Sequence, residues 1–251
     1  HGDAAVAVNS LARYLARLGY GSRKEAEAML RARRVTQPDG QVLREGSAFA
    51  HDAVLVDGAP LDPPPGSVVL LHKPVGYVCS TQDRPPLVYE LLPTRFAQRD
   101  PVMATVGRLD ADTSGLLLLT DDGALNHRLT SPRTHLPKVY LAQLDTLPAA
   151  DALQQLREGG LMLRGETTAL APAGVEPCGE RVVRVTLTEG RYHQVRRMFA
   201  AVGAHVQALH REAFGPLTLG ELQAGQWRVL SENEVVQLRE LARRLPAAAE
   251  R

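Results

Sequence analysis

The sequence has little cysteine, few aromatic residues and no long apolar run. Its 251 residues include only 2 cysteines, Cys79 and Cys178, with no Cys-x-x-Cys pair or Cys/His cluster. This pattern argues against a disulfide scaffold and a structural zinc site, and it predicts free thiols in a reducing compartment. No stretch reaches the roughly 18 apolar residues of a membrane span, and no basic-then-apolar leader is visible. We therefore expect a soluble, cytoplasmic protein.

The chain also lacks a net charge excess: its formal charge is +1, which argues against a protein that coats nucleic acid indiscriminately. The charge is nevertheless segregated. Residues 11–44 carry 8 Lys/Arg against 3 Asp/Glu, and residues 181–211 carry 6 Arg against 1 Glu. These segments are two candidate phosphate-binding surfaces.

Two short helices are predicted near the N-terminus. Leucines repeat at helical spacing over residues 11–18, and Gly19 ends that helix. Ser22 and Glu25 have the spacing of a capping box, which predicts the start of a second helix. At about 100° per residue, four cations fall on one edge of it and are candidate RNA-binding residues: Arg23, Lys24, Arg31 and Arg34. Solvated surface arginines are the alternative interpretation of this edge.

A small hairpin over 41–43 and 53–56 is expected next, with Asp-Gly turns. The order helix, helix, hairpin, together with Leu-Gly-Tyr-Gly-Ser-Arg-Lys-Glu-Ala-Glu and Arg-Val-Thr, resembles the S4 RNA-binding module. We assign residues 10–61 to this module and 1–9 to a tail or an expression remnant. Residues 62–66 are a Pro-rich, semi-rigid linker, and 67–251 form a catalytic domain.

The most informative segment is residues 107–123. It places Asp110 in a polar loop before four consecutive leucines, which predict a short strand buried on both faces. A loop anchored on such a strand can hold a nucleophile, although a turn with an acidic cap is the simpler interpretation of a loop Asp.

A resemblance of the same segment to a known family favours the nucleophile over the acidic cap. Gly-Arg-Leu-Asp-x-x-Thr-x-Gly-Leu-Leu-x-x-Thr-x-Asp-Gly resembles the signature of the pseudouridine synthases that modify ribosomal RNA, and residues 73–76 (Lys-Pro-Val-Gly) resemble the start of their catalytic domain. The resemblance implies an isomerase with no cofactor in which Asp110 is catalytic. An ionised carboxylate in a closed site needs a cation nearby, since burial alone raises its pKa.

Two further segments resemble motifs of the same family. Gly-Arg-Tyr-His-Gln-Val-Arg, residues 190–196, implies that Arg196 pairs with Asp110; without the resemblance these residues would be a basic solvated face. Lys-Val-Tyr, residues 138–140, implies that Tyr140 stacks on the target uracil, with a core tyrosine as the alternative. We treat His193 as a structural histidine and leave it out of the chemistry.

The remaining candidate RNA-binding residues flank these motifs: Arg108, Arg133, Lys138, Arg191 and Arg197. Arg108 is expected to fill the place of a base flipped out of its stack. Asp121 and Asp122 are interpreted as a turn and helix cap, so no metal site is predicted.

Beyond the linker the sequence predicts a catalytic domain of class α+β, with a mixed, mainly antiparallel sheet flanked by helices. Strands are expected near 67–71, 137–144 and 183–187. Helices are expected at 122–129, 147–159 and 192–203, and from Ser231 to Leu245.

The substrate implied by the resemblance is 16S rRNA or a small-subunit assembly intermediate, with uridine 516 as the expected target and a monomeric enzyme. Residues 130–135 and 209–212 are most similar to the small-subunit enzymes. Three alternatives remain: a 23S rRNA enzyme, a non-catalytic RNA-binding assembly protein, and a carboxylate-dependent glycosidase acting on a small sugar.

Overall fold

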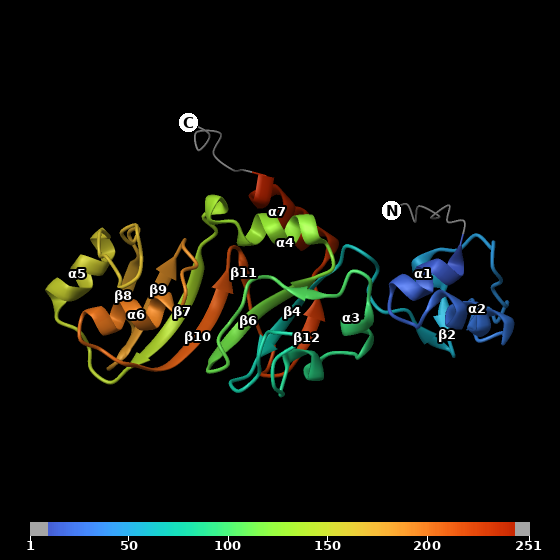
Figure 1. Cartoon of the computed structure of the whole chain (residues 1–251), viewed down its shortest axis with the longest axis horizontal. Coiled ribbons are helices and arrows are strands. Elements are labelled where there is room, and N and C mark those ends of the chain that lie inside the picture. Colours follow the sequence, from blue (N-terminus) through green and yellow to red (C-terminus); the bar gives the residue numbers. More distant parts are fainter. Residues whose placement is uncertain (1–9, 244–251) are drawn as a thin grey trace.

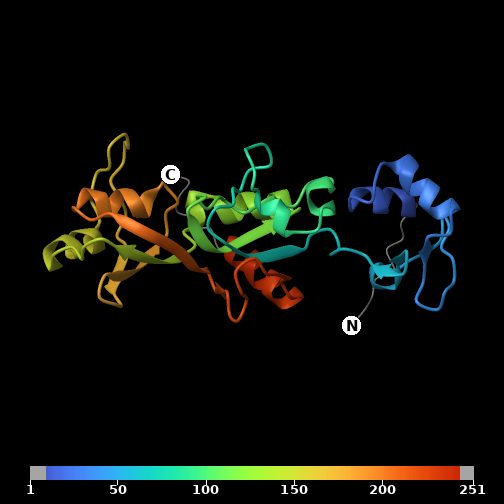
Figure 2. The same ribbon diagram turned by 90° about the horizontal axis from the view of Figure 1, so that it is seen from below.

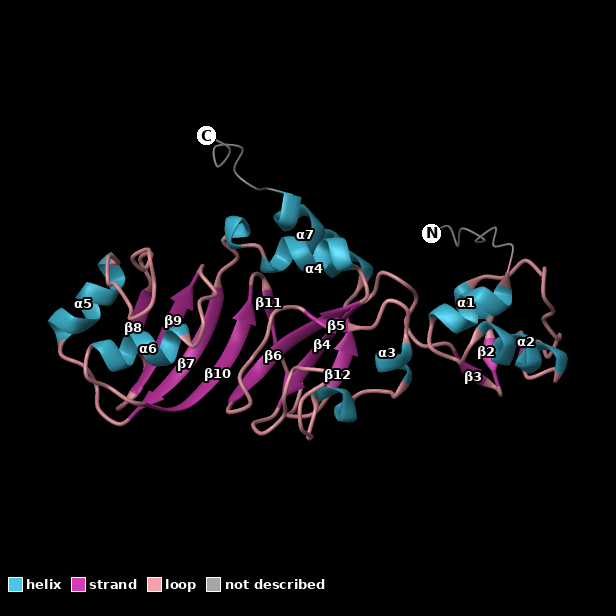
Figure 3. Cartoon of the chain, viewed as in Figure 1, coloured by secondary structure: helices cyan, strands magenta, loops and turns pink. Residues whose placement is uncertain are grey.

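The computed structural model describes residues 10–243, so the expected tail and Leu245 lie outside the described residues. Helices surround a large mixed sheet, which confirms the α+β class (Figure 3). Figure 1 shows a small N-terminal module beside an elongated body that contains this sheet, and Figure 2 shows the same end-to-end arrangement from below. Within the described residues, none of the helices combines the length and the hydropathy that crossing a membrane would require.

The N-terminal module packs two helices on a three-stranded sheet. Its elements are α1 (Leu11–Arg17), α2 (Arg23–Arg31), β1 (Val35–Thr36), η1 (His51–Ala53), β2 (Leu55–Val56) and β3 (Ala59–Pro60). The predicted capping box is present, because Ser22 Oγ accepts from the amide of Glu25 while the Glu25 carboxylate accepts from the amide of Ser22. A hydrophobic cluster of this module's own holds the helices to the sheet.

The expected hairpin is partly wrong. Residues 41–43 contribute only an isolated bridge between Val42 and Thr36, and residues 51–53 form a 3-10 turn instead of the start of a strand. The reason is the turn at Asp57 and Gly58, where φ is 52° and 82°. Positive φ at both central residues suits a tight hairpin, so this turn pairs β2 with β3, while β1 becomes the other neighbour of β2.

The larger sheet has nine strands among the described residues, in the order β12-β4-β6-β10-β7-β9-β8 with β5 on β6 and β11 on β10. Their bounds are β4 (Val68–Lys73), β5 (Ala104–Thr105), β6 (Thr113–Thr120), β7 (Lys138–Leu144), β8 (Gly174–Pro177), β9 (Val182–Leu187), β10 (Val206–Phe214), β11 (Leu217–Thr218) and β12 (Trp227–Val229). The β6–β10 pair is parallel and the other pairs are antiparallel. The four leucines of β6 are fully buried, as predicted.

Helices pack against both faces of this sheet. They are η2 (Val88–Leu91), α3 (Arg95–Gln98), α4 (Gly123–Thr130), η3 (Pro132–Thr134), α5 (Ala150–Glu158), α6 (Gln194–Ala201) and α7 (Glu232–Arg243). Figure 1 shows α4 and α7 together over the central strands and α5 and α6 over β7 to β9. One hydrophobic cluster contains residues of α5, α6 and β7 to β9, and a separate one contains residues around η2 and α3. Tyr140 packs against both of these clusters. The boundary between these two clusters is where the pocket described below opens.

The segment between the two parts is held at several points. Arg95 pairs with Asp62 at 2.5 Å, and its guanidinium lies 4.6 Å above the ring centroid of Tyr20. Arg99 donates to the carbonyl of Pro63 and pairs with Asp121 at 3.2 Å, with both side chains almost fully buried. At the other end of the Pro-rich segment the Gly66 amide donates to Asp121 at 2.8 Å, so the segment is tied to the larger part of the molecule at both of its ends.

Candidate active site

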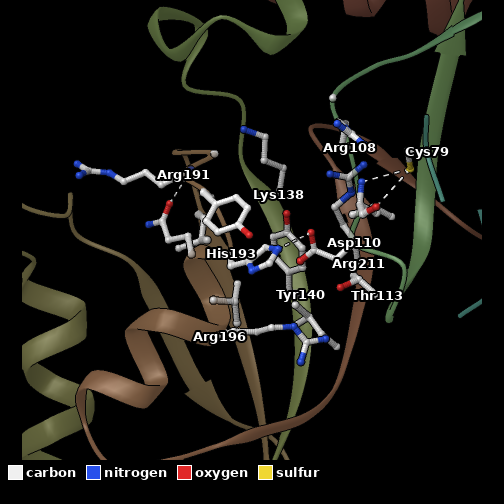
Figure 4. Close-up of a pocket in the computed structure, with 18 of the residues that line it drawn as sticks. Cys79, Arg108, Asp110, Thr113, Lys138, Tyr140, Arg191, His193, Arg196 and Arg211 are labelled. Carbon is white, nitrogen blue, oxygen red and sulfur yellow. Dashed lines mark hydrogen bonds and ion pairs between the residues drawn. The ribbon is translucent and has the colours of Figure 1, made fainter. Parts of the chain in front are cut away.

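A pocket of about 900 Å³ opens on the sheet where the two clusters meet (Figure 4). Besides residues 78–79 and 129–130, most of its lining comes from four segments distant in sequence: the loop before β6, the start of β7, the turn before α6, and β10. Three of these are the segments that the sequence motifs singled out. Asp110, Tyr140 and Arg196 all line this pocket, so the structure brings the three expected catalytic residues together.

The loop that carries Asp110 is fixed by its backbone. The fully buried Lys73 donates from Nζ to the carbonyl oxygens of Asp110 at 3.1 Å, Ala111 at 3.3 Å and Thr113 at 2.7 Å. The Gly76 amide also donates to Ala111, at 2.6 Å. Burial lowers the pKa of Lys73, and the carbonyl acceptors replace the water that its ammonium group loses. Asp110 is thus held by a buried cation that contacts its backbone and not its carboxylate.

Cys79 supports the loop from the other side. Its Sγ donates to the carbonyl of Leu109 at 3.3 Å and accepts from the amide of the same residue at 3.4 Å. Burial raises the pKa of the Cys79 thiol, which keeps it protonated and unreactive. Both cysteines are free, as the sequence predicts.

The expected ion pair between Arg196 and Asp110 is wrong in this structure. Arg196 pairs with Asp112 at 3.1 Å and donates to the carbonyl of Val206, whereas the partner of Asp110 is His193, with Nε2 at 3.0 Å from Oδ1. The cause is the start of α6: His193 is its N-cap at φ 47°, which turns the ring toward the loop, while Arg196 is one turn further along. His193, which we left out of the chemistry, therefore contacts the predicted catalytic carboxylate.

Sheet register places a row of side chains under the Asp110 loop. Lys73 is opposite Gly115, Gly115 is opposite Arg211, and Arg211 is opposite Tyr140. Register partners share a face of the sheet, so the two cations and the tyrosine point to the same side. A Cβ at Gly115 would lie 2.1 Å from the carbonyl oxygen of Arg211, which explains why this position in the motif must be glycine. Tyr140 therefore lies on the pocket side of the sheet.

The expected RNA-binding residues fall into three groups. Most are exposed at the surface: Arg23, Lys24, Arg31, Arg34, Arg108 and Arg133. Arg191 and Arg197 are instead held inside the fold, because both pair with Glu166 and donate to nearby backbone carbonyls. Lys138 is half-buried at the pocket, where burial and, secondarily, Arg211 lower its pKa. Arg191 and Arg197 therefore hold the segment before α6 to the 164–169 loop. Because their guanidinium groups are engaged in these contacts, they are poorly suited to bind RNA phosphates.

Sequence reasoning missed three residues of this site: His193, Lys73 and Arg211. Each stands inside a segment quoted for its resemblance, so the signal was present. A lysine or arginine at the end of an apolar strand is ambiguous until the register shows that it faces the interior. No group of three or more His, Cys, Asp or Glu side chains suited to a metal occurs among residues 10–243.

Comparison with known proteins agrees with this geometry. Residues 67–201 match the family model described as RNA pseudouridylate synthase. The chain is 44% identical over 225 residues to the ribosomal small subunit pseudouridine synthase A of Escherichia coli K12, covering 85% of this chain and 93% of that protein. The synthase of the same name from Vibrio cholerae is 40% identical over 225 residues, covering 86% and 94%.

A solved structure supports the fold independently. A crystal structure of a pseudouridylate synthase superposes with a TM-score of 0.64 at 34% identity, covering 92% of this chain and all of that one. The family match covers β4 to β9, the Asp110 loop, Tyr140 and α6, which build most of the pocket, whereas the pocket wall formed by β10 lies outside the matched residues. The chain therefore belongs to the RNA pseudouridylate synthase family and is an isomerase.

Proposed function

We propose that this enzyme converts one uridine of small-subunit (16S) ribosomal RNA to pseudouridine, with uridine 516 as the expected target. The observation that carries the proposal is the position of Asp110: it lies on a loop fixed by Lys73, in a pocket that Tyr140 also lines and that is large enough for a nucleoside. The near full-length similarity to small-subunit synthases supports the choice of RNA.

The reaction exchanges one bond for another within the same nucleotide. The N1–C1′ bond breaks, the uracil rotates, a C5–C1′ bond forms, the C5 proton is lost and N1 gains a proton. The carboxylate of Asp110 acts either by attacking C1′ or by removing a neighbouring sugar proton. Both routes require an ionised carboxylate, and the imidazole of His193 is a neighbouring hydrogen-bond partner for it.

The surrounding side chains supply binding and access. The ring of Tyr140 stacks on the uracil, and its hydroxyl group can accept or donate a proton during the reaction. Arg108, with a side chain 67% exposed and only a 3.6 Å contact to Asp83, is free to fill the gap that a flipped base leaves in the RNA. Arg196 braces Asp112 and the end of the loop, which is a positioning role.

The N-terminal module is proposed to be an S4-like RNA-binding domain. Its exposed cations on α2, Arg23, Lys24 and Arg31, contact phosphates and recognise RNA mainly by shape, while the larger domain acts on the extruded base. The partner is 16S rRNA or an assembly intermediate of the small subunit, and the enzyme is expected to act as a cytoplasmic monomer.

Asp110→Asn tests the proposal. Unmodified small-subunit rRNA is incubated with wild type and variant, and pseudouridine is mapped by position. The variant should lose at least about 10²- to 10⁴-fold in rate because the amide neither attacks carbon nor accepts a proton. Asp151→Asn, on the exposed start of α5, is the matched control and should keep full activity. Activity that survives Asp110→Asn would refute the mechanism, and modification of large-subunit RNA alone would refute the substrate.

A further inference from the structure

Arg211 is a buried cation without a counter-ion. Its residue is 4% exposed, its Nε donates to the carbonyl of Leu116 at 2.9 Å, and its Nη2 is buried with no hydrogen-bond partner. None of the carboxylates of residues 10–243 lies within ion-pair distance of its guanidinium. Burying an unpaired charge costs several kcal/mol, so a partner is normally present.

The other two buried cations of the catalytic domain do have partners. Lys73 donates to four carbonyl oxygens, and Arg99 pairs with Asp121 and donates to Pro63. Arg211 has one acceptor for the five N–H groups of a guanidinium. Arg99 Nε and Arg196 Nε are also buried without a hydrogen-bond partner, but each of those guanidinium groups pairs with a carboxylate, which Arg211 does not. Among the arginines with an unsatisfied buried nitrogen in residues 10–243, Arg211 is thus the one that lacks a counter-ion.

The position of Arg211 shows where the missing partner would be. It lines the pocket, directly opposite Tyr140 in the sheet register, and Figure 4 shows it beside Asp110. The ring of Phe214 lies 5.3 Å from its guanidinium carbon and limits its movement. A base that stacks on Tyr140 and presents its sugar to Asp110 would place its carbonyl oxygens near this guanidinium.

We propose that Arg211 is a catalytic residue that donates hydrogen bonds to a carbonyl oxygen of the target uracil while the base is detached from the sugar. This inference rests on the proposed function. When the N1–C1′ bond breaks, its electron pair stays on the base and is shared with O2 and O4. The same anion forms whether Asp110 attacks C1′ or removes a sugar proton. After rotation, C5 donates the pair to C1′, the C5 proton leaves and N1 is protonated, so the charge on Arg211's partner is transient.

This role explains the missing counter-ion. A resident carboxylate would neutralise Arg211 in the free enzyme and reduce the stabilisation available to the uracil anion. A cation already fixed and dehydrated needs little reorganisation when negative charge develops. The free energy needed to bury this cation is offset by favourable interactions elsewhere in the fold, as is usual for strained functional groups.

Arg211→Leu and Arg211→Lys test the proposal on the full chain, with unmodified small-subunit rRNA as substrate. Arg211→Leu should lower kcat about 10²- to 10³-fold, the usual effect of removing one donor to a developing oxyanion. Its melting temperature should stay within about 4 °C of wild type or rise, because an unpaired buried charge is removed. Arg211→Lys keeps a charge and should retain more activity. Arg243→Leu, on the exposed end of α7, is the control for losing an arginine.

A purely structural role predicts the opposite pattern: a large fall in melting temperature with kcat per folded molecule preserved, in Arg211→Lys as in Arg211→Leu. That result would overturn the proposal. If wild type modifies the RNA and Arg211→Leu does so equally fast, this inference fails while the proposed function stands. If wild type modifies no ribosomal RNA, the proposed function itself fails.

The group bound is identified with altered RNA. Replacing O2 or O4 of the mapped uridine by sulfur weakens hydrogen-bond acceptance at that atom. One replacement should slow wild type and have no added effect in Arg211→Leu, since the contact is already lost. If this non-additivity appears instead with a phosphorothioate next to the uridine, Arg211 binds phosphate and the assignment to uracil is wrong.

Discussion

The two parts of the molecule treat positive charge differently. In the N-terminal module the cations of α2 are exposed, and Arg34 pairs with Asp57 at the surface. In the catalytic domain Lys73, Arg99 and Arg211 are each at most 4% exposed. Exposed cations suit salt-dependent contact with phosphates. Buried cations instead hold the backbone in place or stabilise a negative charge that develops during the reaction. The net charge of a sequence segment therefore does not show whether its cations contact RNA or form part of the active site.

The strongest test of this contrast is Arg99, the buried cation closest to the N-terminal module. Arg99→Met leaves Asp121, whose side chain is 5% exposed, with the Gly66 amide as its remaining described partner, so we expect a loss of about 3–5 kcal/mol. Urea unfolding measures it. Arg95→Met is the matched control: its side chain is 42% exposed, and it should cost about 0–1 kcal/mol. Equal costs for the two variants would contradict the contrast.

Lys73 gives the second test, within the site. Lys73→Met removes the ammonium group from four carbonyl oxygens, two of them in the Asp110 loop, at a cost of about 2–4 kcal/mol. Because Asp110 then moves, kcat should fall about 10²-fold even at temperatures where the variant is folded. Folded fraction and single-turnover rate are measured on the same sample. A stable variant with a normal rate would show that the loop needs no buried cation.

Much of this fold could be predicted from local patterns. The caps at Ser22 and Asp122 begin α2 and α4, and the leucine run is buried in β6 as expected. The hairpin was misplaced because two Asp-Gly turns compete over a short stretch, and only the three-dimensional packing of Val35 and Val56 decides which strands pair. Local sequence supplies turns and caps, whereas pairing depends on residues distant in the chain.

The site shows the same limit. Resemblance located Asp110, Tyr140 and Arg196, and all three line the pocket. It did not show that His193 would lie against Asp110, because that contact depends on a left-handed backbone conformation at His193, which no periodicity reveals. Nor did spacing show that Arg211 faces the interior, since a one-residue change of strand register reverses the face of a side chain.

The α2 cations provide the third test. Replacing Arg23, Lys24 and Arg31 together by Ala should weaken RNA binding about 10-fold or more and reduce the slope of log affinity against log salt concentration by about 2–3. Binding titrations at several salt concentrations measure both. Rates at saturating RNA should be unchanged, since none of these residues lines the pocket. The control replaces Arg23 and Arg31 by Lys and Lys24 by Arg, which keeps every positive charge. An unchanged salt slope would rule out phosphate contact by α2.

The last and smallest test uses two bidentate ion pairs with similar distances. Arg34 binds Asp57 through two hydrogen bonds of 2.9 and 2.7 Å, and Arg228 binds Glu234 through two of 2.8 and 2.9 Å. They differ in exposure: the Asp57 side chain is 52% exposed and the Glu234 side chain 27%. If burial rather than geometry decides what a pair contributes, only the catalytic-domain pair should affect stability.

The pH dependence of unfolding separates the two. Hydrogen bonds from Arg228 lower the pKa of Glu234 from 4.5 to about 2, so its contribution is complete above about pH 4.5 and is lost as the pH falls toward 2. Discounted for its remaining exposure, this contribution is about 1 kcal/mol. Glu234→Gln should remove it and flatten that part of the profile. Asp57→Asn should leave stability unchanged, because the pair is solvated and Asn also tolerates the left-handed conformation at position 57. Equal losses in the two variants would mean that bidentate geometry alone stabilises these pairs, and the contrast between the two parts of the molecule would then hold only for fully buried cations.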